Sequence, residues 1–147
     1  MIKYIKGNLL DAPQNLIVHG VNCAGGFGRG VAGALKLKYP SVADFYYDKH
    51  NTEGWKLGEF QLVALDDGRI VVNLATQQKY GNDGKLYFNY EAAQRGLVEL
   101  FKFAAHHQYS VAMPKLGCGL GGAEWSKVEA IIKKLAGKSL DVYVYEL

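Results

Sequence analysis

The chain has 147 residues, of which 49% are hydrophobic and 21% charged, and 17 basic against 14 acidic side chains give a net charge of +3. These proportions are typical of an ordinary globular domain, so we expect a single domain over residues 1–147. Because no run of Lys or Arg exists and no apolar stretch reaches the roughly 18 residues of a membrane span, neither a nucleic-acid nor a membrane partner is expected.

Residues 1–7 (MIKYIKG) lack the continuous apolar block of a signal peptide. The two cysteines, Cys23 and Cys118, both lie among glycines and indicate neither a disulfide framework nor a CxxC metal site. We therefore expect a cytoplasmic protein with reduced thiols and no metal, and a monomer.

Hydrophobic spacing predicts strands and helices in alternation. In chain order, we expect a short strand at 4–5, a strand at 16–21, a helix at 31–39 that ends before Pro40, a second helix capped by Ser41, strands at 58–65 and 69–75, a helix at 89–107, a strand at 111–114, a helix at 125–135 and a strand at 142–147. Asp66, Asp67 and Gly68 form a hairpin turn signature. The fold class is therefore α/β, a three-layer α/β/α domain with a mixed central sheet.

The glycines are concentrated in two loops. The chain has 18 glycines, where average usage predicts about ten. Six lie within residues 20–33 (GVNCAGGFGRGVAG) and four within 117–122 (GCGLGG), and each cluster follows a strand and precedes a helix. Glycines before a helix N-terminus let backbone N–H groups bind an anion, although tight turns alone also use glycine. Two such loops at the carboxyl ends of strands indicate a ligand with phosphate in its middle.

Three other motif readings compete for the first loop. Both clusters match GxGxxG, but no acidic residue ends a strand about 20 residues later, which argues against a dinucleotide-binding dehydrogenase. Residues 23–29 (CAGGFGR) match the C-x5-R loop of cysteine-dependent phosphatases, with Cys23 as nucleophile, yet Asn22 and Gly30 depart from that pattern. A small buried thiol, which a glycine-lined loop tolerates well, is the favoured interpretation of Cys23. No GxxxxGK[ST] occurs, so a P-loop nucleoside triphosphatase is excluded.

The chain resembles the macro domain family, whose members bind ADP-ribose. Residues 7–10 (GNLL), 22–32 (NCAGGFGRGVA) and 114–122 (PKLGCGLGG) match three family motifs in the correct order, and they cover nearly the whole chain. Within the family, residues 4–10 (YIKGNLL), 17–23 (IVHGVNC), 38–40 (KYP) and 142–147 (VYVYEL) are most similar to the yeast-type ADP-ribose-1''-phosphate phosphatases.

The resemblance implies a role for each matching position. Asn8, where the family usually has Asp, contacts the adenine amino group, and Asn22 bonds the distal ribose or its water. Phe27 covers that ribose. The full set of implied substrate-binding residues is Asn8, Leu9, Gly26, Phe27, Gly28, Arg29, Gly30, Thr76, Gly117, Cys118, Gly119, Leu120 and Gly121. The resemblance leaves a place at the border of the site open for Tyr80 and Tyr87, but nothing in their spacing indicates it, and packing or a surface position is the favoured expectation for both.

His19 and Asn22 are the predicted catalytic residues. Strand alternation places Ile17, His19 and Val21 on one face, and a polar ring in an apolar strand needs a hydrogen-bond partner. The phosphatase group carries His at the matching position, and an imidazole of near-neutral pKa donates to the leaving sugar oxygen or orders a water. A satisfied core histidine is the alternative.

A second branch of the family removes ADP-ribose from glutamate or nucleic-acid bases. It uses a lysine after the Thr that ends the middle strand and an acidic residue after G-C-G-L, positions that hold Gln77 and Gly121 here. An amide forms no Schiff base and glycine takes no proton. The sequence therefore predicts hydrolysis of the terminal phosphate of ADP-ribose 1''-phosphate, without cofactor. A non-catalytic ADP-ribose reader, a de-ADP-ribosylating enzyme and a Cys23-dependent phosphatase are the alternatives.

Overall fold

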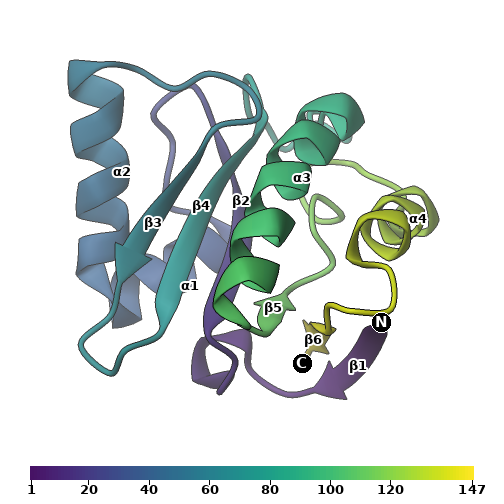
Figure 1. The fold of residues 1–147 in the computed structure, drawn as a ribbon. Coiled ribbons are helices and arrows are strands. Elements are labelled where there is room, and N and C mark those ends of the chain that lie inside the picture. The colour runs from purple at the N-terminus through teal and green to yellow at the C-terminus, as the bar shows by residue number, and fades with distance from the viewer.

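The computed structural model describes all residues from 1 to 147 and contains one six-stranded sheet (Figure 1). Its strands lie in the order β1-β6-β5-β2-β4-β3. Strand β3 is antiparallel to β4, and the other neighbours are parallel. The strands are β1 (Ile2–Lys6), β2 (Leu16–Asn22), β3 (Phe60–Ala64), β4 (Ile70–Gln77), β5 (Val111–Met113) and β6 (Val142–Glu146). The predicted mixed sheet is confirmed.

Helices cover both faces of the sheet, which confirms the three-layer prediction (Figure 1). They are α1 (Gly30–Lys38), α2 (Pro40–Thr52), α3 (Tyr90–His107) and α4 (Trp125–Ala136), together with a 3-10 turn η1 (Leu9–Asp11) that the sequence did not predict. Helices α1 and α2 pack over one apolar cluster of the sheet, and α3 and α4 pack over the other. None of the helices has both the length and the hydropathy that crossing a membrane requires.

Strand β2 lies in the middle of the sheet and is buried on both faces. Leu16 and Val18 pack in the α3/α4 cluster, while Ile17 and Val21 pack in the α1/α2 cluster. His19 lies on the second face, where its ring meets the edge of Phe27 at 5.5 Å between centroids. The alternation of side chains therefore holds, and it brings a buried histidine under α1 and its preceding loop.

The start of α2 differs from the prediction. Pro40 is its first residue, Tyr39 is the N-cap residue, and no side chain caps the helix, so Ser41 is not the cap. Proline fits this position because its φ is already helical and the first helical N–H has no acceptor to lose. Proline therefore ends α1 and also begins α2.

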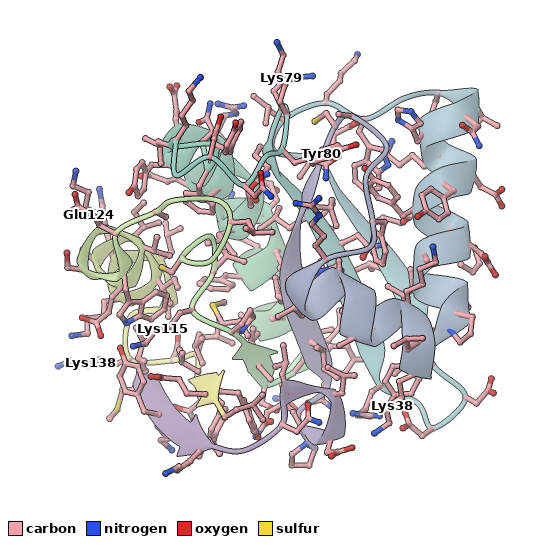
Figure 2. The ribbon with its side chains drawn as sticks, turned by 180° about the vertical axis from the view of Figure 1, so that it is seen from behind. Lys38, Lys79, Tyr80, Lys115, Glu124 and Lys138 are labelled. Carbon is pink, nitrogen blue, oxygen red and sulfur yellow. The ribbon has the colours of Figure 1, made fainter.

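The carboxyl ends of β2, β4 and β5 meet at one edge of the sheet, because these three strands are parallel neighbours. The loops that follow them, at residues 23–29, 78–89 and 114–124, therefore lie at the same end of the molecule. Figure 2 shows Lys79 and Tyr80 at this end and Lys38, the last residue of α1, at the opposite end. The candidate site is at the Tyr80 end.

Candidate functional site

Asn22 folds the first glycine loop around its own side chain. Its Oδ1 accepts hydrogen bonds from the backbone N–H groups of Ala24 (3.0 Å) and Gly26 (3.1 Å), and its Nδ2 donates to the Gly26 carbonyl oxygen at 2.7 Å. The Tyr46 hydroxyl lies 2.7 Å from the Asn22 carbonyl oxygen and 3.0 Å from Oδ1, and it accepts from the Gly25 N–H. The Asn22 side chain is buried and fully engaged, so its visible role is to shape the loop.

This loop leaves a row of backbone donors free. No N–H group from Phe27 through Ala32 donates a hydrogen bond within the protein. Helix α1 begins inside this row, and its N-cap residue Arg29 makes no side-chain capping bond. The partial positive charge of a helix N-terminus therefore adds to a run of free donors, which is the arrangement that binds phosphate.

The second glycine loop has the same property. None of the N–H groups of 115–117 and 119–121 donates within the protein. Gly117 has a φ of +77°, and a Cβ there would lie 2.2 Å from the Phe88 ring, so only glycine fits. The Gly121 carbonyl oxygen accepts from the N–H groups of Tyr87 (2.8 Å) and Phe88 (2.9 Å), which ties this loop to the segment before α3.

Both loops line two adjoining cavities, of about 430 and 240 Å³, that share Gly20, Arg29, Ala32, Gln77 and Leu120. The larger cavity is bordered by the first loop and Tyr80, and the smaller one lies between the start of α1 and the second loop. The two glycine loops therefore converge on one cleft. A diphosphate in this cleft would meet free N–H groups from two sides.

His19 lines the smaller cavity but differs from the expected general acid. Its Nε2 lies 2.5 Å from Oδ1 of Asn73, and its Nδ1 is buried without a partner. Burial lowers the pKa of His19 to about 4, against an ordinary value of 6.5. The near-neutral pKa expected from the sequence is therefore wrong, because complete burial penalises the charged imidazolium. At pH 7 the ring is neutral and can act through an acceptor nitrogen.

Most of the predicted binding residues line the two cavities. They are Gly26, Phe27, Gly28, Arg29, Gly30, Thr76, Gly117, Gly119 and Leu120. The Phe27 ring is buried against Tyr46 and Tyr47, so it forms part of the wall.

Four predicted binding residues do not line these cavities: Asn8, Leu9, Cys118 and Gly121. Asn8 instead caps the short turn η1, with its Oδ1 accepting from the Leu10 N–H at 3.0 Å, and Leu9 is buried. Cys118 lies within the second loop, where its Sγ is 3.5 Å from the Leu116 carbonyl oxygen.

Tyr80 is a cleft residue that was expected to be a packing or surface residue. It lines the larger cavity while remaining 52% exposed, and a Cβ on Gly26 would lie 2.6 Å from its ring. The ring therefore covers the glycine loop from the side of β4. The available sequence signal was its position three residues after the end of β4, at the edge of the sheet where both glycine loops lie. Tyr87 does not line either cavity and bonds Asp83.

The thiol of Cys23 is poorly suited to nucleophilic attack. The residue is buried in the α1/α2 cluster, and this burial raises the pKa of the thiol. A reactive cysteine requires the opposite shift, toward the thiolate. No group of three or more His, Cys, Asp and Glu side chains is arranged to hold a metal ion.

The chain is similar to several known proteins. It is 28% identical to a DNA ADP-ribosyl glycohydrolase of Thermus aquaticus over 99% of its length, although it spans only 41% of that protein. An ADP-ribose 1''-phosphate phosphatase of Candida glabrata is 27% identical, with 99% of this chain and 98% of that protein covered. A solved structure of a Bacteroides thetaiotaomicron protein of unknown function is 32% identical with a TM-score of 0.92, over 100% of this chain and 98% of that one.

The family model for the macro domain matches residues 18–132, which include most of β2, both glycine loops and most of α4. That match agrees with the converging loops, and the chain belongs to the macro domain family.

Proposed function

We propose that this protein binds an ADP-ribose nucleotide in the cleft between the two glycine loops and hydrolyses the terminal phosphate of ADP-ribose 1''-phosphate. The observation that carries the proposal is that two rows of backbone N–H groups without acceptors border one cleft. One row is residues 27–32, and the other is residues 115–121, in which only the Cys118 N–H has an acceptor. Backbone donors held in place stabilise charge that develops on phosphate oxygens without having to reorganise. Relatives named ADP-ribose 1''-phosphate phosphatase support this choice of substrate.

In the proposed reaction, water attacks the terminal phosphorus and the bond between phosphorus and the C1'' oxygen breaks. The free N–H groups stabilise the charge on the phosphate oxygens, and the leaving sugar oxygen takes a proton from solvent, giving ADP-ribose and inorganic phosphate. His19 orders water or a sugar hydroxyl, because a neutral buried ring has little capacity to donate a proton. Asn22 acts by holding the loop in the conformation in which its N–H groups have no acceptor within the protein.

The test is phosphate release from ADP-ribose 1''-phosphate in the presence of EDTA. We expect release by the purified protein, and none from para-nitrophenyl phosphate, which lacks the nucleotide. A Gly33→Ala variant purified in parallel controls for contaminating phosphatases. Tight binding of ADP-ribose in a calorimeter without any phosphate release would contradict hydrolysis and identify a non-catalytic reader.

Release of ADP-ribose from DNA is the second candidate, favoured by the names of the glycohydrolase relatives. Gln77 and Gly121 argue against the lysine-dependent route. A Cβ on Gly121 would lie 2.7 Å from the carbonyl oxygen of Gly117, so an acidic residue there would require the loop to move. We expect no adduct when ADP-ribosylated DNA is mixed with the protein and borohydride. A trapped adduct, or free ADP-ribose, would favour the second candidate.

A further inference from the structure

Three polar side chains form one rung across the middle of the sheet. His19 on β2 is the register partner of Asn73 on β4, and Asn73 is the register partner of Gln61 on β3. His19 Nε2 lies 2.5 Å from Asn73 Oδ1, and Asn73 Nδ2 lies 3.0 Å from Gln61 Oε1. The rung therefore runs from the smaller cavity to the edge strand.

A backbone carbonyl fixes the direction of these hydrogen bonds. Asn73 Nδ2 also lies 3.2 Å from the carbonyl oxygen of Val42, and a carbonyl oxygen only accepts. The amide nitrogen of Asn73 must therefore face Val42, and its Oδ1 must face His19. Because that oxygen also only accepts, the hydrogen of the neutral imidazole is on Nε2, and Nδ1 carries a lone pair.

That lone pair lacks a donor. Nδ1 is buried without a hydrogen-bond partner, in a residue that is 1% exposed and lines the smaller cavity. Leaving a buried polar atom unpaired costs about 1–3 kcal/mol. The two glycine loops around this cavity present N–H donors, which suit phosphate oxygens, whereas an acceptor suits a hydroxyl. In one cleft, phosphate oxygens would thus accept hydrogen bonds from the loop N–H groups, and a sugar hydroxyl would donate one to His19 Nδ1.

We infer that Asn73 is a positioning residue, which holds His19 as the Nε2–H tautomer so that Nδ1 accepts a hydrogen bond from a ligand sugar hydroxyl or the attacking water. The inference builds on the proposed function, since it names how the same cleft receives the uncharged part of its nucleotide. If the three polar side chains only stabilised the sheet, ligand binding would leave Nδ1 unchanged, whereas the positioning role requires that Nδ1 gain a hydrogen-bond donor when the cleft is filled.

Nitrogen NMR of the histidine-labelled protein measures the tautomer directly, with His19→Gln used to assign the resonances. In the free protein we expect Nε2 protonated and Nδ1 bare. Addition of ADP-ribose should shift the Nδ1 resonance toward that of a hydrogen-bonded acceptor without protonating it. A proton on Nδ1 in the free protein, or an unmoved Nδ1 resonance with ADP-ribose bound, would overturn the inference.

Two variants separate positioning from stability. Asn73→Leu removes the acceptor for Nε2–H at similar volume, and we expect a mixture of tautomers and about a ten-fold loss in kcat with a smaller change in KM. Gln61→Leu removes the outer partner of the rung, together with the hydrogen bond from Gln61 Nε2 to the Phe45 carbonyl oxygen, and leaves the contact between Asn73 and His19 in place. The tautomer should be unchanged, and kcat should stay within about two-fold of the original. An unchanged tautomer and kcat in Asn73→Leu would contradict the role of Asn73.

The proposed function and this inference fail in distinguishable ways. Absence of phosphate release, with Nδ1 still shifted by ADP-ribose, contradicts hydrolysis and supports the acceptor role. Phosphate release with an unmoved Nδ1 contradicts the acceptor role and supports hydrolysis. If ADP-ribose does not bind, the proposed function and the acceptor role both fail.

Discussion

A methyl group on Gly33 would lie 2.8 Å from the carbonyl oxygen of Gly28. The first turn of α1 and the first glycine loop therefore approach each other at a distance that only glycine permits, since the opposing atom is backbone. This contact sets where the free N–H row begins relative to the helix axis.

Gly33→Ala is expected to weaken ADP-ribose binding by ten-fold or more, because displacing the loop by about 1 Å misplaces its donors. Alanine has the higher helix propensity, worth about 1 kcal/mol, so the melting temperature should fall little. Calorimetry and thermal unfolding measure the two effects. Leu37→Ala, at an 87% exposed position of the same helix, is the matched control and should bind normally. Normal binding by Gly33→Ala would show that the loop tolerates displacement.

Asn22→Ala is expected to disorder the first loop. The substitution leaves the N–H groups of Ala24 and Gly26 without their acceptor, and we expect about 2–3 kcal/mol of lost stability together with weaker nucleotide binding. Asn22→Asp keeps an acceptor oxygen and should retain more stability, as urea unfolding can measure. Equal stability of Asn22→Ala and the unmodified protein would contradict the loop-shaping role.

Cys23→Ser is expected to leave phosphate release within about two-fold of the original rate. Burial raises the pKa of the Cys23 thiol, so the thiolate that a nucleophilic mechanism needs is disfavoured. Turnover of ADP-ribose 1''-phosphate and alkylation by iodoacetamide are the measurements. Cys118, which is less buried, should react first. Complete loss of turnover in a folded Cys23→Ser variant would reinstate the cysteine phosphatase mechanism.

Stability is expected to fall with acid because of His19. The unfolded chain binds a proton near pH 6.5, whereas the folded protein does so only near pH 4, so the unfolded state binds more protons between these values. The contribution is fully present above pH 6.5 and is lost as the pH falls toward 4, by about 3 kcal/mol in total. Urea unfolding near pH 7.5 and near pH 4.5 measures it. His19→Gln should lose less over this range, and an equal loss in both proteins would assign the effect to other groups.

The sequence predicted the elements well where local chemistry decides them. A run of apolar, largely β-branched residues marked β2, helical spacing marked α3, and Asp66 to Gly68 marked the hairpin, because each signal arises from neighbours in the chain. Ser41 failed as a helix cap because Pro40 competes for the same turn, and cap preference alone does not rank the two.

Contacts between distant segments explain the other differences. Tyr80 became a cleft residue because β4 ends beside β2, which brings its ring over Gly26. The hydrogen-bond partner of His19 is Asn73, 54 positions away in the chain, and Asn73 in turn donates to the carbonyl oxygen of Val42. No local pattern contains those pairings.

By itself, the sequence determined that two glycine loops follow buried strands and precede helices, and this arrangement is what led us to expect a phosphate-containing ligand. Only the tertiary structure decided that the two loops face one cleft, that Asn22 holds its loop in place, and that His19 is buried with Asn73 as its hydrogen-bond partner. The physical reason is that backbone conformation is set largely by adjacent residues, whereas burial and hydrogen-bond polarity are set by what packs around a group.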